Sequence, residues 1–304
     1  MKLLVTGGAG FIGSRIATQL IEQGHSVRVF DNLSTGSAAA IPEGATFFNG
    51  DMRDTSALRM AVAGQDAVIH LAAQALVTES ITDPVKAFDI NLLGGQNLLE
   101  AMHQAGVKRL VHSSTAAVYG NPANVPIAED DPKMPINPYG ATKYAFEQLL
   151  HAYHASYGFE VVIFRYFNPY GPTEHHLPET HAIPNFIRAT LTSQPIPLYW
   201  QGKQIRDFFY VDDIARAHVM ALEKRGFHIF NLGSGRVTTV MEIVQKIFEI
   251  TGRSSPIEDL GERAGDPPRL LADVTKVEKE LGWKPEISLQ DGLTRTITAF
   301  KERP

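Results

Sequence analysis

A short apolar run at the start of the sequence leads directly into a glycine-rich turn, and this junction constrains the fold more than any other segment. The run covers residues 2–6, and an amphipathic stretch over residues 11–23 follows the turn Gly7-Gly8-Ala9-Gly10-Phe11-Ile12-Gly13. Gly7 would permit the tight turn, Gly10 would let a diphosphate approach backbone N–H groups, and Gly13 would let helix and strand pack closely. A strand, a glycine turn and a helix in this order predict a dinucleotide-binding unit.

An acidic residue at the end of the next strand strengthens this prediction and indicates which dinucleotide binds. Asp31 closes the predicted strand over residues 26–31, at the distance from the turn expected of a carboxylate that holds the adenosine ribose diol. A 2′-phosphate would meet this carboxylate, and the segment Asn32-Leu33-Ser34 that follows contains no basic partner. Arg15 and Arg28 are the nearest bases, so the sequence favours NAD over NADP.

Apolar runs and longer amphipathic stretches alternate through the first half of the chain. Predicted strands cover residues 67–71, 108–113 and 160–165, and predicted helices cover 83–104 and 139–157. Several strands are apolar on successive residues, as strands covered on both faces must be. Gly24, Gly106 and Gly158 stand where helix ends favour a left-handed residue. We therefore predict an α/β fold with a doubly wound parallel sheet, a Rossmann fold.

The pattern changes after about residue 168, where repeated prolines divide the chain into short pieces. Predicted strands at 206–211 and 227–231, around a helix at 212–224, return the chain to the sheet. Helices at 238–250 and 289–301 complete a smaller α/β C-terminal substrate-binding lobe. The expected NAD-binding domain is 1–168 plus the return at 206–232, and the expected lobe is 169–205 plus 233–304.

Composition excludes several classes of function. The 304 residues carry a net charge of −5 without a basic run, which disfavours nucleic acid as a partner. Cysteine is absent, so disulfides, thiolate catalysis and cysteine-ligated metals are excluded. His70 and Gln74 interrupt the longest apolar segment, and the first apolar run is too short for a signal peptide. We expect no membrane segment and a cytoplasmic protein.

Tyr139 and Lys143 form the strongest catalytic candidate. They stand four residues apart after Pro138, so a helix would place both on one face. The ammonium group could stabilise a phenolate and make Tyr139 a usable base near neutral pH. The alternative for Lys143 is a surface ion pair with Glu147.

The chain contains the same spacing once more, at Tyr199 and Lys203. Two prolines precede this second pair and Gly202 lies inside it, so we expect no helix to align the two groups.

The segment Val111-His112-Ser113-Ser114-Thr115-Ala116-Ala117-Val118-Tyr119-Gly120 resembles the extended short-chain dehydrogenase/reductase family that acts on nucleotide sugars. The Gly-x-x-Gly-x-x-Gly spacing of the amino-terminal turn resembles the same superfamily. The resemblance covers essentially the whole chain and implies that Thr115 is the catalytic hydroxyl beside Tyr139 and Lys143. Ser113 and Ser114 remain alternatives for that hydroxyl. Family members that resemble this sequence along its whole length are mostly enzymes that epimerise UDP-hexoses at C4.

The same resemblance implies two sets of binding residues. Substrate contacts would come from Thr115, from Asn168 to the diphosphate or sugar, from Arg206 and Arg263 to the diphosphate, and from Asp266 to the nucleoside ribose. Two guanidinium groups suit a diphosphate because each can form paired charge-assisted hydrogen bonds. The NAD contacts would be Gly7, Gly10, Phe11, Ile12, Gly13, Asp31, Asn32, Asp51, Met52, Leu71, Ala72, Ala73, Asn91, Ser113, Tyr139, Lys143 and Tyr166. For Asp51 and Met52, an ordinary strand-end turn is the alternative.

The implied reaction is an NAD-dependent 4-epimerisation of a UDP-hexose through a transient 4-keto sugar. A 4,6-dehydratase would need an acid and a base directly after Thr115, where Ala116 and Ala117 stand. A nucleotide-sugar reductase or dehydrogenase, UDP-glucuronate 4-epimerase and a non-catalytic NAD-binding regulator remain alternatives.

Three further expectations concern specificity, metals and assembly. Uronate epimerases resemble this chain through Tyr170-Gly171-Pro172 and then carry an Arg, whereas Thr173-Glu174-His175-His176 follows here, which favours a neutral hexose. Glu174, His175 and His176, together with Glu179 and His181, form a cluster that could hold zinc. The prolines in this loop leave no fixed helical or strand spacing, so we expect no metal. The predicted helices at 83–104 and 139–157 suggest a homodimer by resemblance.

Overall fold

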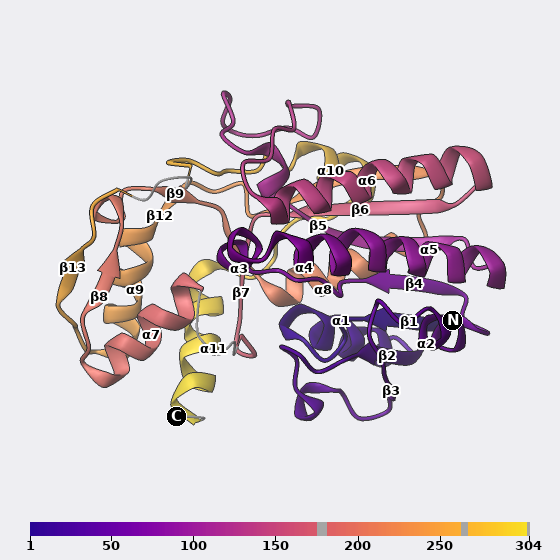
Figure 1. Cartoon of the computed structure of the whole chain (residues 1–304). Helices are drawn as coiled ribbons and strands as arrows, with labels where there is room; N and C mark the ends of the chain where they lie inside the picture. Colours follow the sequence, from indigo (N-terminus) through magenta and orange to yellow (C-terminus); the bar gives the residue numbers. More distant parts are fainter. Residues whose placement is uncertain (175–180, 263–266, 303–304) are drawn as a thin grey trace.

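The computed structural model describes residues 1–174, 181–262 and 267–302. Seven parallel strands form the main sheet in the order β3-β2-β1-β4-β5-β6-β11, which is the order of a doubly wound fold and confirms the predicted class (Figure 1). The strands are β1 (Lys2–Thr6), β2 (Ser26–Asp31), β3 (Thr46–Asn49), β4 (Ala67–His70), β5 (Arg109–Thr115), β6 (Glu160–Tyr166) and β11 (Phe227–Leu232).

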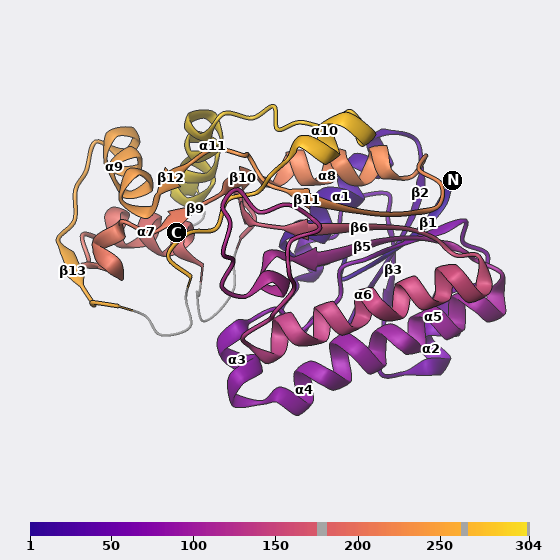
Figure 2. The same cartoon turned by 90° about the horizontal axis from the view of Figure 1, so that it is seen from above.

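Helices cover both faces of this sheet (Figure 2). On one face lie α1 (Phe11–Glu22), α8 (Val211–Ala221) and α10 (Thr275–Leu281), and on the other lie α2 (Thr55–Val62), α5 (Gly94–Ala105) and α6 (Pro138–Tyr157). Each face has its own apolar cluster, so the strands between them are buried on both sides, as their continuous apolar runs predict. Left-handed φ angles at Gly106 and Gly158 end α5 and α6 as expected.

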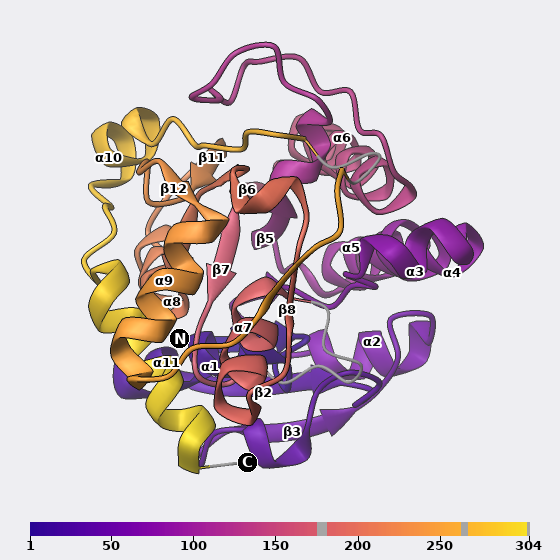
Figure 3. The same cartoon turned by 90° about the vertical axis from the view of Figure 1, so that its left-hand side faces the viewer.

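A smaller lobe lies beside the carboxyl ends of the strands, in front of the sheet in Figure 3. Its own apolar cluster joins the helices α7 (Ala182–Thr192), α9 (Val240–Thr251) and α11 (Leu289–Glu302) to the short strand β8 (Ile196–Leu198). The strand β13 (Ile257–Asp259) pairs with β8 in parallel. The helix α7 was not predicted because Pro184 indicated a break, but proline is tolerated in a first helical turn, where the N–H lacks an intrahelical partner.

The predicted strand at 206–211 does not join the main sheet. Instead β9 (Ile205–Arg206) pairs with β12 (Thr238–Thr239), and β10 (Phe208–Tyr210) pairs with β7 (Asn168–Tyr170). The prediction was wrong because buried Asp207 splits the segment, and its carboxylate accepts backbone N–H groups of Gly235 and Ala272 at 3.1 and 3.0 Å. Only β11 returns to the sheet, at its edge.

The predicted helix at 83–104 is interrupted. It consists of α4 (Pro84–Phe88), a π-helical turn at Asp89–Leu93, and α5, and a short helix α3 (Val77–Thr82) precedes it. Short 3-10 turns lie at Ala38–Ala40, Ala116–Tyr119 and Trp200–Gly202. Across residues 1–174, 181–262 and 267–302, no helix combines the length and the apolar character needed to cross a bilayer.

Candidate active site

The glycine turn has the geometry that its sequence predicts. Gly7 has a φ of +72°, and a Cβ there would lie 2.7 Å from the Ala72 nitrogen. A Cβ on Gly13 would collide with the Gly7 carbonyl oxygen, so helix α1 packs closely on the turn. On Gly10, a Cβ would meet only the Gly7 oxygen, at 3.3 Å. The turn is therefore tight where it packs and open at Gly10, which suits the approach of a diphosphate.

Asp31 holds the turn at the end of β2. One carboxylate oxygen accepts the Ala9 N–H at 3.0 Å, and the other accepts the Leu33 N–H at 2.8 Å. Each oxygen keeps a further acceptor position, so these contacts leave capacity for two ribose hydroxyls. Asp31 thus has a structural role besides the predicted ribose contact.

Two of the predicted NAD contacts, Asp51 and Met52, lie just after β3. Asp51 accepts hydrogen bonds from the Asn32 side chain at 2.9 Å and from the Arg53 guanidinium at 2.8 Å, and the Arg53 contact holds the pKa of this carboxyl well below its usual value. Met52 is buried against Gly94, where a Cβ would lie 2.8 Å from that of Met52.

We predict that Asp31→Ala weakens NAD binding by about tenfold or more, because a charged acceptor of ribose hydroxyls is removed. Discrimination against NADP should fall as well, since the carboxylate that repels a 2′-phosphate is absent. Dissociation constants for NAD and NADP, measured on both proteins, check this. An unchanged preference in the variant would assign cofactor selection to another residue.

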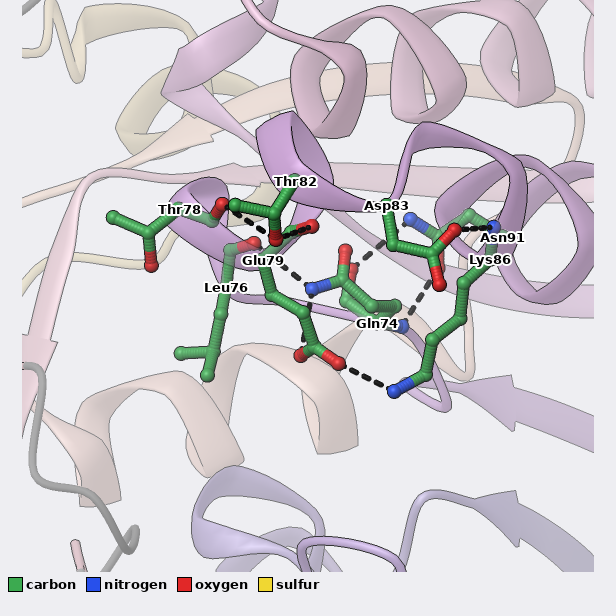
Figure 4. A network of polar contacts seen from close by, with 8 residues as sticks. All are labelled: Gln74, Leu76, Thr78, Glu79, Thr82, Asp83, Lys86 and Asn91. Atoms are coloured by element: carbon green, nitrogen blue, oxygen red, sulfur yellow. Dashed lines mark hydrogen bonds and ion pairs between the residues drawn. The ribbon is translucent and has the colours of Figure 1, made fainter.

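A polar network fixes the loop that follows β4 (Figure 4). Buried Asn91 accepts the Gln74 backbone N–H at 2.8 Å, donates to its carbonyl at 3.1 Å, and donates to Thr142 on α6 at 3.0 Å. The Gln74 side chain donates to Glu79 at 3.1 Å, and Glu79 pairs with Lys86. Asn91 thereby ties the loop containing Leu71, Ala72 and Ala73 to the helix that carries Tyr139, which makes it a positioning residue.

The structure brings the three predicted catalytic residues together at the carboxyl end of β5. Thr115 ends that strand, and its side chain lies near enough to the Tyr139 phenol to lower the pKa of that phenol. Asn137 caps α6 through the Gly140 N–H at 2.8 Å, and buried Ser80 on α3 accepts the Tyr139 N–H at 3.1 Å. Lys143, one turn further on, is buried and donates to the Ser113 carbonyl at 2.6 Å.

Burial dominates the acid–base properties of this group. It raises the pKa of Tyr139 to about 12 against the opposing effect of Thr115. It lowers the pKa of Lys143 to about 7, although nearby Glu147 favours the charged form. The Tyr139–Lys143 spacing therefore does not by itself produce a base near neutral pH, and a further positive charge beside the phenol is needed.

The structure contradicts the surface ion pair considered for Lys143, and it shows the Ser114 hydroxyl bonded elsewhere. Lys143 is not a surface lysine paired with Glu147, because both are buried and Glu147 instead pairs with Arg165 at 2.6 Å. Ser114 donates to Glu147 at 2.5 Å, so its hydroxyl is engaged away from Tyr139. Of these hydroxyl residues, Thr115 is the one whose side chain lowers the pKa of the Tyr139 phenol, and its catalytic role stays a prediction.

The second Tyr-x-x-x-Lys pair lacks a helix, as predicted. Tyr199 precedes the 3-10 turn at Trp200–Gly202, and the left-handed φ angles of Trp200 and Gln201, +55° and +52°, interrupt regular structure between Tyr199 and Lys203.

Two of the predicted substrate residues meet at the junction with the smaller lobe. The Asn168 N–H donates to the Asp207 carbonyl at 3.0 Å, which places Asn168 beside the residue that follows Arg206. Among the residues that the structure describes, the buried side-chain oxygen of Asn168 has no hydrogen-bond partner, as expected of a group that a ligand satisfies. Arg206 is buried in β9 and donates to the Ile205 carbonyl at 2.8 Å. Arg263 and Asp266 lie outside the described residues.

The acidic and histidine cluster considered for zinc is largely outside the described residues as well, since it includes His175, His176 and Glu179. Glu174 is buried, and the His181 ring lies 2.5 Å from its carboxylate. Within the described ranges, no group of three or more acidic, histidine or cysteine side chains is arranged to hold a metal ion.

Several residues of the site were not identified from the sequence. Glu147 and Arg165 join α6 to β6, Asp207 joins the sheet region to the smaller lobe, and His218 contacts Tyr166. The apolar neighbours of Glu147 and Arg165 give an indirect signal, because a charge in a buried stretch needs a partner. The partners themselves could not be identified, since they lie in remote segments.

Comparisons with known proteins agree on one family. The model of the NAD dependent epimerase/dehydratase family matches residues 3–233. A UDP-glucose 4-epimerase of Corynebacterium glutamicum is 42% identical over 303 residues, covering 94% of this chain and 91% of that protein. The crystal structure of UDP-glucose 4-epimerase with UDP-glucose from Thermotoga maritima aligns with a TM-score of 0.96 at 37% identity over 99% of both chains. The UDP-glucose 4-epimerase of Thermus thermophilus in complex with NAD gives a TM-score of 0.93 at 38% identity over the full length of both chains.

Proposed function

This chain belongs to the NAD-dependent epimerase/dehydratase family, and from that premise we propose that it interconverts a UDP-hexose and its C4 epimer. The observation that carries the proposal is the grouping of Thr115, Tyr139 and buried Lys143 at the carboxyl end of β5, at the same edge of the sheet as the glycine turn that follows β1. The names of its relatives, UDP-glucose 4-epimerases, support the same reaction.

Each residue of the group has a part in moving one proton. Tyr139 removes the proton of the sugar O4 hydroxyl and returns it after the 4-keto sugar has turned over, with Thr115 holding the phenol in place. Lys143 contributes positive charge from a position fixed by the Ser113 carbonyl. Bound NAD would accept and return the C4 hydride, and its oxidised ring would bring the further positive charge that Tyr139 needs.

Two alternatives are less well supported. Ala116 and Ala117 form the 3-10 turn directly after Thr115, so neither position supplies the acid or base that a 4,6-dehydratase requires. A non-catalytic regulator would not need the buried Lys143 one helical turn from Tyr139. Burying a lysine ammonium costs free energy, and such burial is typical of catalytic sites.

We propose residues 1–168 with the return at 206–232 as the NAD-binding domain, and 169–205 with 233–304 as the nucleotide-sugar lobe. The separate apolar clusters of sheet and lobe support two units, although Val277 and Trp283 pack in the cluster of the sheet, and Phe208 and Tyr210 pack in that of the lobe. Asn168 and Arg206, at the junction, would contact the diphosphate or sugar.

We predict turnover of UDP-glucose and UDP-galactose well above that of UDP-glucuronate. Glu174 is a buried acidic residue in the segment where uronate enzymes carry an Arg, and a uronate carboxylate beside it would be repelled. Interconversion followed by NMR, with each UDP-sugar in turn, checks both reaction and specificity. Absence of any interconversion would contradict the epimerase proposal, and preference for the uronate would contradict only the specificity.

We propose a homodimer as the working assembly. Large apolar side chains along α3, α4 and the π-helical turn are exposed: Ile81 by 60%, Val85 by 66%, Phe88 by 44% and Leu93 by 41%. Several large apolar side chains exposed on successive short helices favour a protein partner. Sedimentation should give about twice the 33.4 kDa chain mass, and Val85→Glu should shift the protein to monomer. A monomeric unchanged protein would refute the assembly.

A further inference from the structure

Asp207 stands at the point where one stretch of backbone changes its pairing partner. Before it, Ile205 on β9 pairs in parallel with Arg269, through hydrogen bonds of 3.0 Å to the residues on either side of Arg269. A parallel ladder continued by two residues would bring the Ala272 N–H to the carbonyl of Asp207. That carbonyl instead accepts the Asn168 N–H of β7, at 3.0 Å. The chain therefore leaves one neighbouring segment for another at Asp207.

The Asp207 carboxylate accepts the N–H that this change of partner leaves over. One of its oxygens accepts the Ala272 N–H at 3.0 Å and the Gly235 N–H at 3.1 Å, and the other accepts the backbone N–H and the hydroxyl of Ser234. The carboxylate is fully buried, and a Cβ on Gly233 would lie only 2.4 Å from it. Asp207 thus ties the loop after β11 and the segment at Ala272 to the end of β9.

Two predicted substrate contacts flank this junction. Arg206 directly precedes Asp207, and Asn168 pairs with Phe208 across β7 and β10. Residues two apart in an extended chain share a face, so this register places Arg206 and Asn168 on one face and the Asp207 side chain on the other. The buried side-chain oxygen of Asn168 has no partner in the described part of the chain, which leaves it available to a ligand. Asp207 can therefore hold both residues from behind.

We propose that Asp207 is a positioning residue for the substrate diphosphate. The proposal rests on the proposed function, in which a UDP-sugar contacts Arg206 and Asn168. The carboxylate fixes the backbone that carries these two side chains before the diphosphate arrives. Groups that are already in place lose less conformational freedom on binding, which raises affinity without a new contact. The expected effect is therefore on substrate binding rather than on proton transfer by Tyr139.

UDP is the probe for the first test, because it carries the diphosphate without the sugar. Asp207→Asn keeps the size of the side chain, but its amide group meets backbone N–H donors with a donor of its own. The UDP dissociation constant should rise by about tenfold, the scale of one hydrogen bond, and the KM for UDP-glucose should rise more than kcat falls. Calorimetric titration should show unchanged NAD binding. Unchanged UDP affinity, or an equal loss for UDP and NAD, would overturn the proposal.

Asp213 provides a matched control, because it is another buried carboxylate that accepts two backbone N–H groups. Its partners are Glu286 and Ile287, at 3.0 and 3.1 Å, and neither is a predicted substrate residue. Asp213→Asn should lower the melting temperature and leave UDP affinity unchanged. A loss of UDP affinity as large as that of Asp207→Asn would show a general effect of destabilisation and would overturn the proposal.

Ser234→Ala is a milder variant of the same contact. It keeps the carboxylate and removes the hydroxyl that donates to it, so the UDP dissociation constant should rise by about threefold even if Asp207→Asn does not fold. An unchanged constant would overturn the proposal.

The unchanged protein separates this proposal from the proposed function. If it interconverts UDP-glucose and UDP-galactose while the variants bind UDP normally, only the role of Asp207 is wrong. If it neither binds UDP nor interconverts UDP-sugars, the proposed function is wrong, and the role of Asp207 is wrong with it.

Discussion

Tyr139→Phe should reduce kcat for UDP-glucose interconversion by about 10²-fold or more, the scale of a lost general acid–base group. The ring at the start of α6 is retained, and only the hydroxyl beside Thr115 is removed. We therefore expect unchanged folding and NAD binding. Steady-state turnover by NMR, together with a melting curve and an NAD titration, checks all three.

Tyr199→Phe is the matched control, because Tyr199 stands at the same spacing from a lysine without a helix between them. This variant should keep its activity. An active Tyr139→Phe would exclude the assigned proton transfer, even if Tyr199→Phe behaved as expected.

Arg165→Met should lower the free energy of unfolding by about 3–5 kcal/mol, because Glu147 would remain as a buried charge without its partner. The two side chains are only 1% and 0% exposed and form two hydrogen bonds, at 2.6 and 3.0 Å. Arg165 also donates to the Tyr119 hydroxyl and the Glu129 carbonyl, at 2.8 and 2.9 Å. Urea unfolding at neutral pH, with the slope compared between proteins, measures the change.

Arg225→Met tests the same chemistry at the surface. Arg225 pairs with Glu160 at 2.6 Å, but their side chains are 60% and 32% exposed, so we expect a loss of about 0–1 kcal/mol. In Arg165→Met with Glu147→Leu, part of the stability should return, since the unpaired charge is gone. Equal losses at the buried and exposed pairs would show that burial does not determine the value of this ion pair.

The sheet and the turn could be predicted from sequence because each depends on neighbouring residues. The continuous apolar run of β1 and the spacing of Gly7, Gly10 and Gly13 specify a buried strand and a phosphate-binding turn locally. Tyr139 and Lys143 could be paired for the same reason, since a helix sets the distance between residues four apart. Thr115 required the family pattern, because three hydroxyl residues are adjacent there.

Partners and protonation could not be predicted, because both depend on contacts between segments remote in the chain. Glu147 could pair with nearby Lys143 or with Arg165, and only the packing of α6 on β6 favours Arg165. The same packing buries Lys143 and lowers its pKa to about 7, which no spacing reveals. His218 contacts Tyr166 only because α8 crosses β6 in the folded chain. Local spacing determines which groups can act together, and burial by distant segments determines their charge and partners.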